Sequence, residues 1–421
     1  MRVGVIGGGL TGLATVHELR SRDVDVVGFE ATAEPGGVIR SREVADTVIE
    51  LGPQRLRAGG IVRSYLEELD LLDELVVADD NLPIYVYGNG SLGEVPFDPR
   101  TMLRTDLLSW RGKARLLLEP VTAPAAPGET VAEYFTRKLG HEAYRAGIEP
   151  LFGGLYGSDP AEMPVDYALA PIMAQETGRG VLSRLALKRL RSSGGQPPPA
   201  VLAGGMQRLP EAIYTANSEA VRLGTPVKRL EVGNSTHQIV TPSSTETVDH
   251  VVIATDASAA AEIVGASLPE LAGHLDALRY NPLAMVYLEA SIDRRGLGFQ
   301  VRRDEPLQTL GVSWNGVAFD RGDLHTVFLG GMHNPELVEA SDDRLISIAT
   351  EEFEAIMDVP AAGLAVHRLD PGMPAYDRSW SHTRELAPPP GIHLAGNYTS
   401  RVGIPGRLRQ ARRIADELTR S

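Results

Sequence analysis

Cysteine does not occur among the 421 residues of the chain. Its absence excludes disulfide bonds, thiolate metal sites, iron–sulfur clusters, a cysteine nucleophile and a cysteinyl link to a flavin. The strings H-E-x-x-H and G-x-S-x-G and a complete P-loop are missing too. Any redox chemistry of this protein must therefore belong to a bound cofactor, and no metal site is expected.

Positive charge is scarce. The chain carries 41 basic residues against 55 acidic ones, which gives a formal net charge of -14, and only four of the basic residues are lysines. A nucleic-acid-binding protein needs a concentrated basic face to neutralise phosphates. The composition therefore argues against nucleic acid as a partner.

Long apolar runs are missing as well. No stretch approaches the roughly 20 uninterrupted apolar residues of a membrane-spanning helix. The first residues, MRVGVIGGGL, lack the long apolar core and the cleavage site of a signal peptide. We therefore expect a cytoplasmic protein, while peripheral membrane contact through an amphipathic helix stays open.

The pattern of elements predicts an α/β fold with two interleaved domains. Strand-like runs followed by small-residue turns and helical patterns occur at the start, in the middle and at the end of the chain. We expect a discontinuous Rossmann-like cofactor-binding domain of residues 1–85, 200–265 and 366–421. Residues 86–199 and 266–365 would form a substrate-binding domain, which combines a helical segment at 100–192 with a mixed sheet.

The strongest motif is the string Gly7-Gly8-Gly9-Leu10-Thr11-Gly12, which follows a strand and precedes a helix. In such a G-x-G-x-x-G string the first glycine permits the turn, the second lets a pyrophosphate approach the backbone, and the third permits close helix packing. Glu30 ends the next strand, where a carboxylate accepts hydrogen bonds from a ribose. A chance glycine-rich turn does not account for this order of strand, turn, helix and acid.

A second glycine pair, Gly36 and Gly37, follows in EATAEPGGVIRS. The pair fits a second approach of the backbone to the same diphosphate, and Arg40 would neutralise or orient a phosphate. On its own the string also fits a plain β-turn with a solvated arginine. Simple NAD-dependent dehydrogenases do not normally carry this extension, so it favours FAD.

These runs resemble a known family. GGGLTGLA, FEATAEPGGVIRS and IELGPQRLRAGG are similar to the amino terminus of the flavin monoamine oxidase superfamily, and GGVIRS with ELGP is closest to its protoporphyrinogen/coproporphyrinogen oxidase branch. The resemblance continues in order through essentially the whole chain, in LSWRGKARLLLEP, PLFGGLYGSDPAEMPVDYALAP, GGMQRLPEAI, VVIATDASAAAEIV, LGFQVRRDEPLQTLGVSWNGVAF and LAGNYTSRVGIP.

The resemblance implies non-covalently bound FAD. It assigns the pyrophosphate to the first glycine string, the ribose to Glu30, the adenine to the backbone of Val227, and the flavin ring to the segments after residues 51 and 395. Trp380 falls where the family often places an aromatic residue near the flavin, and a core tryptophan is the alternative. The expected contacts are Gly7, Gly8, Gly9, Leu10, Thr11, Gly12, Glu30, Ala31, Gly36, Gly37, Arg40, Gly52, Pro53, Gln54, Arg55, Val227, Trp380, Gly396, Asn397, Val402, Gly403 and Ile404.

The chain departs from the family in one substrate contact. The family carries an arginine in the hairpin that contacts a substrate propionate, whereas Pro83 and Ile84 occupy that neighbourhood here. Either Arg55, Arg57 or Arg179 supplies the missing cation, or the substrate differs.

The implied function is oxidation of a porphyrinogen, protoporphyrinogen IX or coproporphyrinogen III, to the porphyrin in haem biosynthesis. A hydride would leave a bridging carbon for flavin N5, three cycles would remove six electrons, and no catalytic side chain is assigned. Oxygen or a quinone would accept the electrons, and a homodimer stays open. The alternatives are an amine oxidase, a carotenoid-type desaturase and a non-catalytic flavoprotein. No lysine lies in a segment resembling the one that supplies the flavin-facing lysine of amine oxidases.

Overall fold

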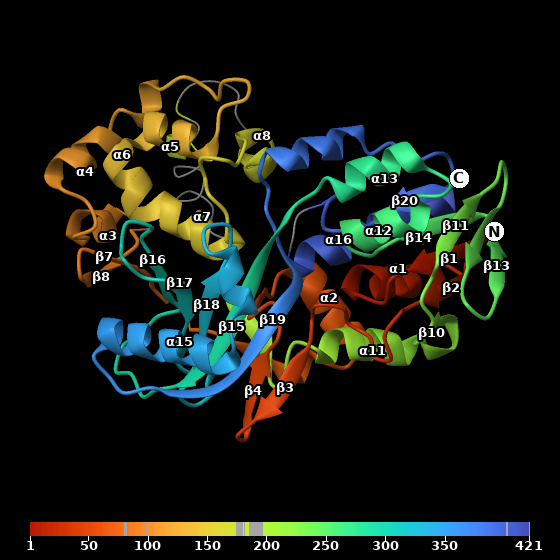
Figure 1. Cartoon of the computed structure of the whole chain (residues 1–421), viewed down its shortest axis with the longest axis horizontal. Coiled ribbons are helices and arrows are strands. Elements are labelled where there is room, and N and C mark those ends of the chain that lie inside the picture. The colour runs from red at the N-terminus through yellow and green to blue at the C-terminus, as the bar shows by residue number, and fades with distance from the viewer. Residues whose placement is uncertain are drawn as a thin grey trace.

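The structure is a computed structural model that describes residues 1–79, 82–96, 99–173, 180, 182–184, 197–400 and 403–420. Two main sheets organise the molecule, one in each half (Figure 1). Helices cover the sheets, and a separate group of helices lies beyond the larger sheet. This arrangement confirms the α/β class.

The first sheet is five-stranded and parallel. Its strand order is β10 (Val221–Arg222), β2 (Asp25–Phe29), β1 (Arg2–Ile6), β14 (His250–Ile253) and β20 (Ile392–Leu394). The strands are apolar runs because both faces of a parallel sheet are covered. They come from segments far apart in the chain, so the beginning, middle and end of the sequence meet in one sheet.

Each face of this sheet has its own cover. One face packs against α1 (Leu10–Arg20), α2 (Gly60–Glu68), α11 (Arg208–Ala216) and α16 (Ile404–Arg420). The other face packs against α12 (Ala257–Val264), α13 (Pro269–Asp276) and an antiparallel sheet of β11 (Arg229–Val232), β12 (His237–Val240) and β13 (Thr245–Val248). In the sequence, the short helix η4 (Ser218–Ala220) connects α11 to strand β10. These layers form a doubly wound domain.

The second sheet is seven-stranded and mixed. Its order is β19 (Ala362–Pro374), β15 (Tyr280–Glu289), β18 (Leu324–Gly330), β17 (Thr309–Ser313), β16 (Gly298–Val301), β7 (Ile84–Gly88) and β8 (Ser91–Glu94). β7 and β8 form a hairpin whose turn residues, Asn89 and Gly90, have φ of 54° and 73°. This is the left-handed turn that an Asn-Gly pair favours. Helix α15 (Asp342–Met357) packs on this sheet.

Several small elements lie outside the two main sheets and the helices named so far. They are β3 (Ser41–Val44), β4 (Thr47–Glu50), β5 (Leu56–Arg57), η1 (Leu72–Glu74), β6 (Leu75–Val77), β9 (Pro199–Leu202), α14 (Asn315–Phe319), η5 (Pro335–Glu339) and η6 (Arg378–Glu385). β3 pairs with β4, and β9 pairs with both β5 and β6. In the sequence, the segment after β4 follows strand β2 of the first sheet and precedes strand β7 of the second sheet.

The expected helical segment is helical in its described part. It comprises α3 (Pro99–Arg104), α4 (Trp110–Leu116), η2 (Glu119–Val121), α5 (Val131–Leu139), α6 (His141–Ala143), η3 (Tyr144–Ile148), α7 (Glu149–Tyr156), α8 (Val165–Ala168) and α9 (Ala170–Met173). Helix α5 begins with a capping box, in which Thr130 and Glu133 satisfy each other's backbone amides. Within the described residues, no helix has the length and apolar character needed to cross a membrane.

The observed elements cross two of the expected domain boundaries. Strand β7 spans the boundary at residue 85, and strand β19 spans the one at residue 366. Helix α13 lies in the residues expected for the substrate domain, yet Leu271 and Leu275 pack in the core of the parallel sheet. Sheet membership decides these boundaries, and the sequence pattern alone does not reveal it.

Candidate active site

The candidate site lies at one edge of the parallel sheet. Ile6 of β1 pairs with Phe29 of β2 and with Ile253 of β14, and Ile253 pairs with Leu394 of β20. The carboxyl ends of these four strands are therefore level. Ligands of doubly wound sheets bind at this edge, because the loops after the strands converge there.

The three glycines of the first string are needed for three different reasons. Gly7 has φ of 110°, which only glycine adopts without strain. A Cβ on Gly12 would lie 1.9 Å from the carbonyl oxygen of Gly7, so helix α1 can pack there only with glycine. Gly9 has an ordinary φ of -71°, and a Cβ there would meet only the Cα of Gly37, at 4.0 Å. The protein itself leaves room for a side chain at Gly9, as a site for a bound group would.

Helix α1 begins at this point without a cap. Gly9 offers no side-chain hydrogen bond to the first turn, and that turn contains no acidic residue. The first amides of a helix and its dipole favour an anion, especially where no side chain already satisfies them. The open end of α1 therefore suits the pyrophosphate expected beside Leu10 and Thr11.

Glu30, the expected ribose contact, lies beside the first glycine string. Its carboxylate is buried and accepts hydrogen bonds from the amides of Gly8 (2.6 Å) and Thr32 (2.8 Å). A Cβ on Gly8 would come within 2.6 Å of Glu30's own Cβ, so Gly8 is the residue that admits this carboxylate. Exposed Ala31 follows it, and the carbonyl of Glu30 accepts from the amide of Thr225 (2.8 Å), two residues before Val227. The expected adenosine contacts are thus neighbours.

The second glycine pair lies against the first string. The amide of Gly36 donates to the carbonyl of Gly8 (2.8 Å), and Gly9 and Gly36 form a parallel bridge. A Cβ on Gly37 would lie 3.1 Å from the Cα of Gly9. Arg40, three residues on, pairs with Glu34 at 3.7 Å, and its buried Nε has no hydrogen-bond partner among the described residues. The two glycine motifs therefore share one surface, as a common diphosphate requires.

The segment Gly52–Arg55 follows β4 and packs on the same loop. A Cβ on Gly52 would lie 1.9 Å from the carbonyl oxygen of Val38, so a glycine is needed at this contact. Gln54 donates to the carbonyls of Glu50 (2.9 Å) and Gly52 (3.0 Å). The side chain of Gln54 thereby fixes the course of the backbone through Pro53.

A buried polar network on the larger sheet holds Gln54 in place. Its Oε1 accepts from Asn315 (2.8 Å) and Thr326 (2.9 Å). Next to it, the buried carboxylate of Glu50 pairs with Arg321 at 2.7 Å. Burial raises the pKa of Glu50, and Arg321 opposes that effect. This network ties the candidate site to the second sheet, and the sequence reasoning missed its distant partners, because only Gln54 lies in a recognisable motif.

Arg55 extends toward the start of strand β16. Its guanidinium is half-buried and makes two long contacts, to the carbonyl of Leu297 (3.4 Å) and to Ser313 Oγ (3.3 Å). Burial, and then the nearby Arg57, lower the pKa of Arg55 to about 10, so it keeps its charge at neutral pH. No carboxylate of the described residues pairs with it. A cation in this position suits an anionic ligand.

The carboxyl-terminal segment closes the edge next to β14. Ala395 donates to the carbonyl of Ile253 (2.8 Å), and Gly396 is covered by the ring of Tyr398. The side chain of Asn397 accepts from the hydroxyl of Tyr280 (2.8 Å). Gly403, with φ of 102°, precedes α16, whose first residue, Ile404, is buried against the helices that include α1. The junction between β20 and α16 thus lies at the same edge of the sheet as the junction between β1 and α1.

Four expected residues are placed differently or are not described. Trp380 is only 2% exposed, its indole donates to the carbonyl of Arg279 (3.1 Å), and its ring lies 4.6 Å from that of Tyr376. These contacts are those of the core alternative. Arg57 is exposed and donates to the carbonyl of Pro197 (2.9 Å). Val402 and Arg179 lie outside the described residues.

These features together fit a flavin dinucleotide. The uncapped start of α1, the open space beside Gly9, the carboxylate of Glu30 and the buried Nε of Arg40 are the kinds of group that would hold a pyrophosphate and a ribose. The chain matches the family described as flavin containing amine oxidoreductase over residues 10–419.

The chain belongs to this family. The match confirms the resemblance to the flavin monoamine oxidase superfamily, and the protein is an FAD-dependent oxidoreductase. Similar proteins include protoporphyrinogen oxidase 2 of Arabidopsis thaliana, 25% identical over 99% of this chain and 93% of its own. Protoporphyrinogen oxidase of Homo sapiens is 29% identical over 78% of this chain and 76% of its own.

Solved structures share the fold at low identity. A proposed protoporphyrinogen oxidase from Exiguobacterium sp. 255-15 superposes with a TM-score of 0.82, at 23% identity over 99% of this chain and 98% of that one. Cyclohexylamine oxidase from Brevibacterium oxydans IH-35A gives 0.72, at 18% identity over 99% of both chains. The fold is therefore common to oxidases whose substrates differ.

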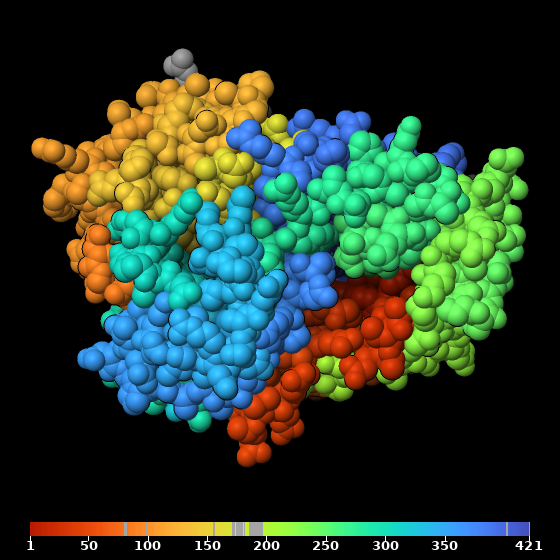
Figure 2. Space-filling view, in the orientation of Figure 1, coloured from red at the N-terminus to blue at the C-terminus, as the bar shows by residue number. Residues whose placement is uncertain are grey.

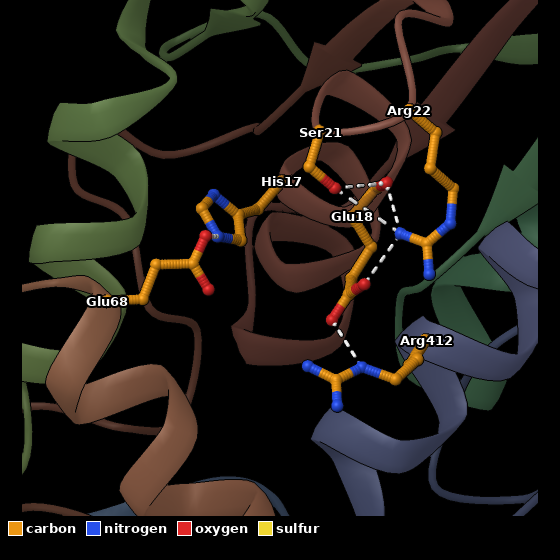
Figure 3. Close-up of a pocket in the computed structure, with 6 residues that line it drawn as sticks. All are labelled: His17, Glu18, Ser21, Arg22, Glu68 and Arg412. Atoms are coloured by element: carbon orange, nitrogen blue, oxygen red, sulfur yellow. Dashed lines mark hydrogen bonds and ion pairs between the residues drawn. The ribbon is translucent and has the colours of Figure 1, made fainter.

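A polar pocket elsewhere on the family fold is separate from the candidate site. It is lined by His17, Glu18, Ser21, Arg22, Glu68 and Arg412, at the carboxyl end of α1 (Figure 3). Glu18 is bonded to Tyr65 (2.6 Å), Arg22 (2.7 Å) and Arg412 (2.9 Å). The charged groups of the pocket satisfy one another, and none of the expected site residues lines it.

Proposed function

We propose that the protein oxidises a porphyrinogen, protoporphyrinogen IX or coproporphyrinogen III, to the corresponding porphyrin in haem biosynthesis. The observation that carries this proposal is Arg55, a half-buried cation beside the flavin-site segment that no carboxylate of the described residues neutralises. A porphyrinogen brings propionate groups, which need such a cation. The similarity to protoporphyrinogen oxidases along nearly the whole chain supports the same assignment.

The position of Arg55 supports its proposed role in place of the missing hairpin arginine. The carbonyl that Arg55 contacts belongs to Leu297, whose amide donates to the carbonyl of Pro83 (2.9 Å). The next residue, Gly298, pairs with Ile84 in the sheet. The cation thus reaches the neighbourhood of Pro83 and Ile84 from the segment between β4 and β5. We propose Arg55, rather than exposed Arg57, as the propionate contact.

The residues of the chain would orient both reactants. FAD, when bound, would accept one hydride, which carries two electrons, per cycle, so three cycles would remove the six electrons that separate porphyrinogen from porphyrin. The glycine loops and Glu30 would hold its dinucleotide part, and the Gln54 network would hold the segment beside the ring. Arg55 would fix the substrate by its propionate, which presents a bridging carbon without a catalytic side chain. Six protons leave with the electrons, to oxygen or a quinone as the acceptor.

A porphyrin-formation assay tests the proposal. Freshly reduced protoporphyrinogen IX and coproporphyrinogen III would be mixed with the FAD-loaded protein under air, and porphyrin fluorescence followed. We expect formation well above the autoxidation rate for one of the two substrates. A rate equal to that with the FAD-free protein, for both substrates, would refute the proposed function.

Arg55→Gln tests the propionate contact separately. The variant should keep its FAD and raise KM for the porphyrinogen about tenfold to a hundredfold, which corresponds to about 1.5–3 kcal/mol for a hydrogen bond to a charged group. The exposed Arg57→Gln is the matched control and should behave like the wild type. An ester of the substrate lacks the carboxylate, so its KM should be the same for Arg55→Gln and the wild type. If the two proteins also have equal KM values for the free acid, Arg55 does not contact the substrate.

Oxidation of an amine is the second candidate function. It is favoured by the family and by the shared fold with cyclohexylamine oxidase. Peroxide release from cyclohexylamine, with no porphyrin formed, would select it over the first. The electron acceptor, the oligomeric state and the cytoplasmic location stay predictions.

A further inference from the structure

A tyrosine of the second sheet reaches the edge of the parallel sheet. Tyr280 is the first residue of β15, and its ring lies edge-on against Trp380, with 6.1 Å between the centroids. Its hydroxyl bonds the side chain of Asn397 (2.8 Å), in the segment after β20. The first residues of α1, α12 and α16 meet in the middle of the molecule (Figure 1), and Figure 2 shows the surface hollowed there between red and green residues. One expected flavin contact is therefore held by a residue of the other sheet.

Two bonds fix the direction of the Tyr280 hydroxyl. The backbone amide of Ala257, at the start of α12, donates to the hydroxyl oxygen at 3.3 Å. An amide N–H cannot accept, so the phenolic proton goes to the other partner, Asn397. Burial raises the pKa of Tyr280 to about 12, so the hydroxyl keeps this proton at neutral pH. The carboxamide of Asn397 therefore turns its oxygen, not its nitrogen, toward Tyr280.

The same bond decides where the nitrogen of Asn397 points. The oxygen and the nitrogen of a carboxamide lie on opposite sides of one carbon atom, so Nδ2 is turned away from Tyr280. Among the described residues, no group accepts a hydrogen bond from Nδ2, and Nδ2 is not one of the buried atoms without a partner. Asn397 itself is only partly buried. Its N–H donors are therefore accessible at the edge where the flavin ring is expected.

The backbone next to Asn397 is held separately. Gln410 of α16 donates to Thr399 Oγ1 (2.6 Å) and accepts from Ser400 Oγ (3.0 Å). Gln410 is buried, so these bonds tie the segment firmly to the last helix. With the backbone fixed in this way, the remaining freedom of Asn397 is the rotation of its carboxamide. The bond from Tyr280 restricts that rotation.

We propose that Tyr280 is a positioning residue, which orients the carboxamide of Asn397 so that its nitrogen donates a hydrogen bond to the flavin ring of bound FAD. The acceptor atoms of this ring gain negative charge when the ring is reduced. A hydrogen bond to a charged acceptor is about twice as strong as one to a neutral acceptor. The donor therefore favours reduced over oxidised FAD and raises the reduction potential. This role depends on FAD, and it does not depend on a porphyrinogen substrate.

The reduction potential of the FAD-loaded protein tests this role. It would be measured against a reference dye during slow reduction by xanthine and xanthine oxidase. Tyr280→Phe keeps the ring but removes the proton that orients Asn397. We expect the affinity for reduced FAD, relative to oxidised FAD, to fall about threefold to tenfold, which lowers the two-electron potential by about 15–30 mV. Tyr65→Phe is the matched control, because it removes a buried tyrosine hydroxyl that bonds Glu18 (2.6 Å), and it should keep the wild-type potential.

Asn397→Asp separates orientation from folding. The carboxylate accepts the same proton from Tyr280, but it has no N–H to donate and it adds a negative charge. Its potential should therefore fall at least as far as that of Tyr280→Phe. In the double variant Tyr280→Phe/Asn397→Asp, loss of the hydroxyl should lower the potential little further, because no donor is left to orient.

Nuclear magnetic resonance of isotope-labelled FAD gives an independent measurement. The ring atom that accepts the hydrogen bond should shift in Tyr280→Phe and in Asn397→Asp, and not in Tyr65→Phe. The proposal fails if Tyr280→Phe keeps the wild-type potential and spectrum, or if it lowers the potential by the same amount in the Asn397→Asp background. Loss of FAD from Tyr280→Phe alone would also overturn it, because the hydroxyl would then hold the site together instead. No substrate enters these measurements, so their failure leaves the porphyrin-formation assay unaffected.

Discussion

The two ends of helix α1 differ in how their polar groups are satisfied. At its first turn, three glycines and an uncapped N-terminus leave backbone amides without side-chain partners. At its last turns, Glu18 accepts hydrogen bonds from Arg22 and Arg412, which Figure 3 shows. It accepts a third from the hydroxyl of Tyr65, so these polar groups satisfy one another. At the first end no side chain caps the helix, whereas at the second end the polar side chains pair with one another. Unsatisfied polar groups therefore locate the binding site better than the presence of charged residues does.

The first end of α1 also separates two glycines that the fold requires from one that the fold does not require. Gly7 is needed for its φ and Gly12 for its contact with the Gly7 carbonyl, so any protein with this turn would need them. Gly9 has neither need. Substitutions along α1 should therefore affect folding, cofactor binding or neither, depending on position.

Gly12→Val should have the largest effect. Its Cβ would overlap a backbone oxygen at 1.9 Å, which neither α1 nor β1 can move to relieve. We expect a loss of more than about 4 kcal/mol in the free energy of unfolding, seen as failure to fold or as a collapsed urea midpoint. Gly60→Ala is the control, because a Cβ there meets nothing within 4 Å. A stable, yellow Gly12→Val protein would contradict this packing.

Gly9→Leu should abolish FAD binding but leave the fold intact. The side chain would occupy the space expected for the pyrophosphate, while its Cβ makes only an ordinary contact with Gly37. The unfolding free energy of the FAD-free protein should stay within about 1 kcal/mol of the FAD-free wild type. FAD absorbance after gel filtration measures retention. Wild-type FAD content in this variant would show that the diphosphate lies elsewhere.

Glu18→Gln should destabilise the protein by about 2–3 kcal/mol, since it removes the shared acceptor and leaves two arginines and a buried tyrosine partly unsatisfied. Urea unfolding of the FAD-free protein would measure this loss, and FAD content should not change. Exposed Glu67→Gln in the neighbouring helix α2 is the control. Loss of FAD from Glu18→Gln without loss of stability would make this cluster part of the cofactor site instead.

Acid should reduce the contribution of Glu18. Burial by itself raises the pKa of Glu18, but hydrogen bonds from Tyr65, Arg22 and Arg412 outweigh it and leave the pKa below its ordinary value. Because the folded pKa is lower than the unfolded one, the stabilisation is complete above the unfolded pKa, near 4.3. It disappears as the pH falls through the folded pKa. The difference in stability between wild type and Glu18→Gln should be constant from pH 7 to about 5 and shrink below that; a constant difference down to pH 3 would exclude this linkage.

Glu68→Gln should have the smallest effect. Glu68 is half exposed and lies 3.0 Å from His17, at the rim of the same pocket. Exposed ion pairs contribute about 0–1 kcal/mol, so we expect a change of at most about 0.5 kcal/mol in unfolding free energy. A loss as large as that of Glu18→Gln would mean that the rim and the buried centre act as one unit, as a double-mutant cycle would show.

The sequence predicted those parts of the molecule that depend on neighbouring residues. The strand before Gly7, the helix after Gly12 and the Asn89-Gly90 hairpin follow from local conformational rules, and the structure has each of them. The fold class and FAD followed from motifs in a fixed order. The assignment of individual residues to FAD stays a prediction, although the structure brings the two glycine motifs and Glu30 to one surface.

The parts that the sequence could not predict depend on distant pairing. Gln54 is held by Asn315 and Thr326, more than 250 residues away, and no local pattern marks that contact. The same holds for the core position of Trp380 and for strand β19, which runs through an expected domain boundary. Burial and sheet membership are properties of the assembled fold, so a motif can name a residue without placing its side chain.

The pairing of α1 with α16 has a consequence for how the protein is made. Arg22 and Asp416, 394 positions apart, form an ion pair at 2.7 Å, and Gly403 and Ile404 reach the site edge from the start of α16. A growing chain that contains only β1 and β2 already includes the first glycine string. It still lacks Gly403 and Ile404 at the start of α16. The proposed flavin site is therefore complete only after α16 has been translated, and we expect stable FAD binding to follow the synthesis of this last helix.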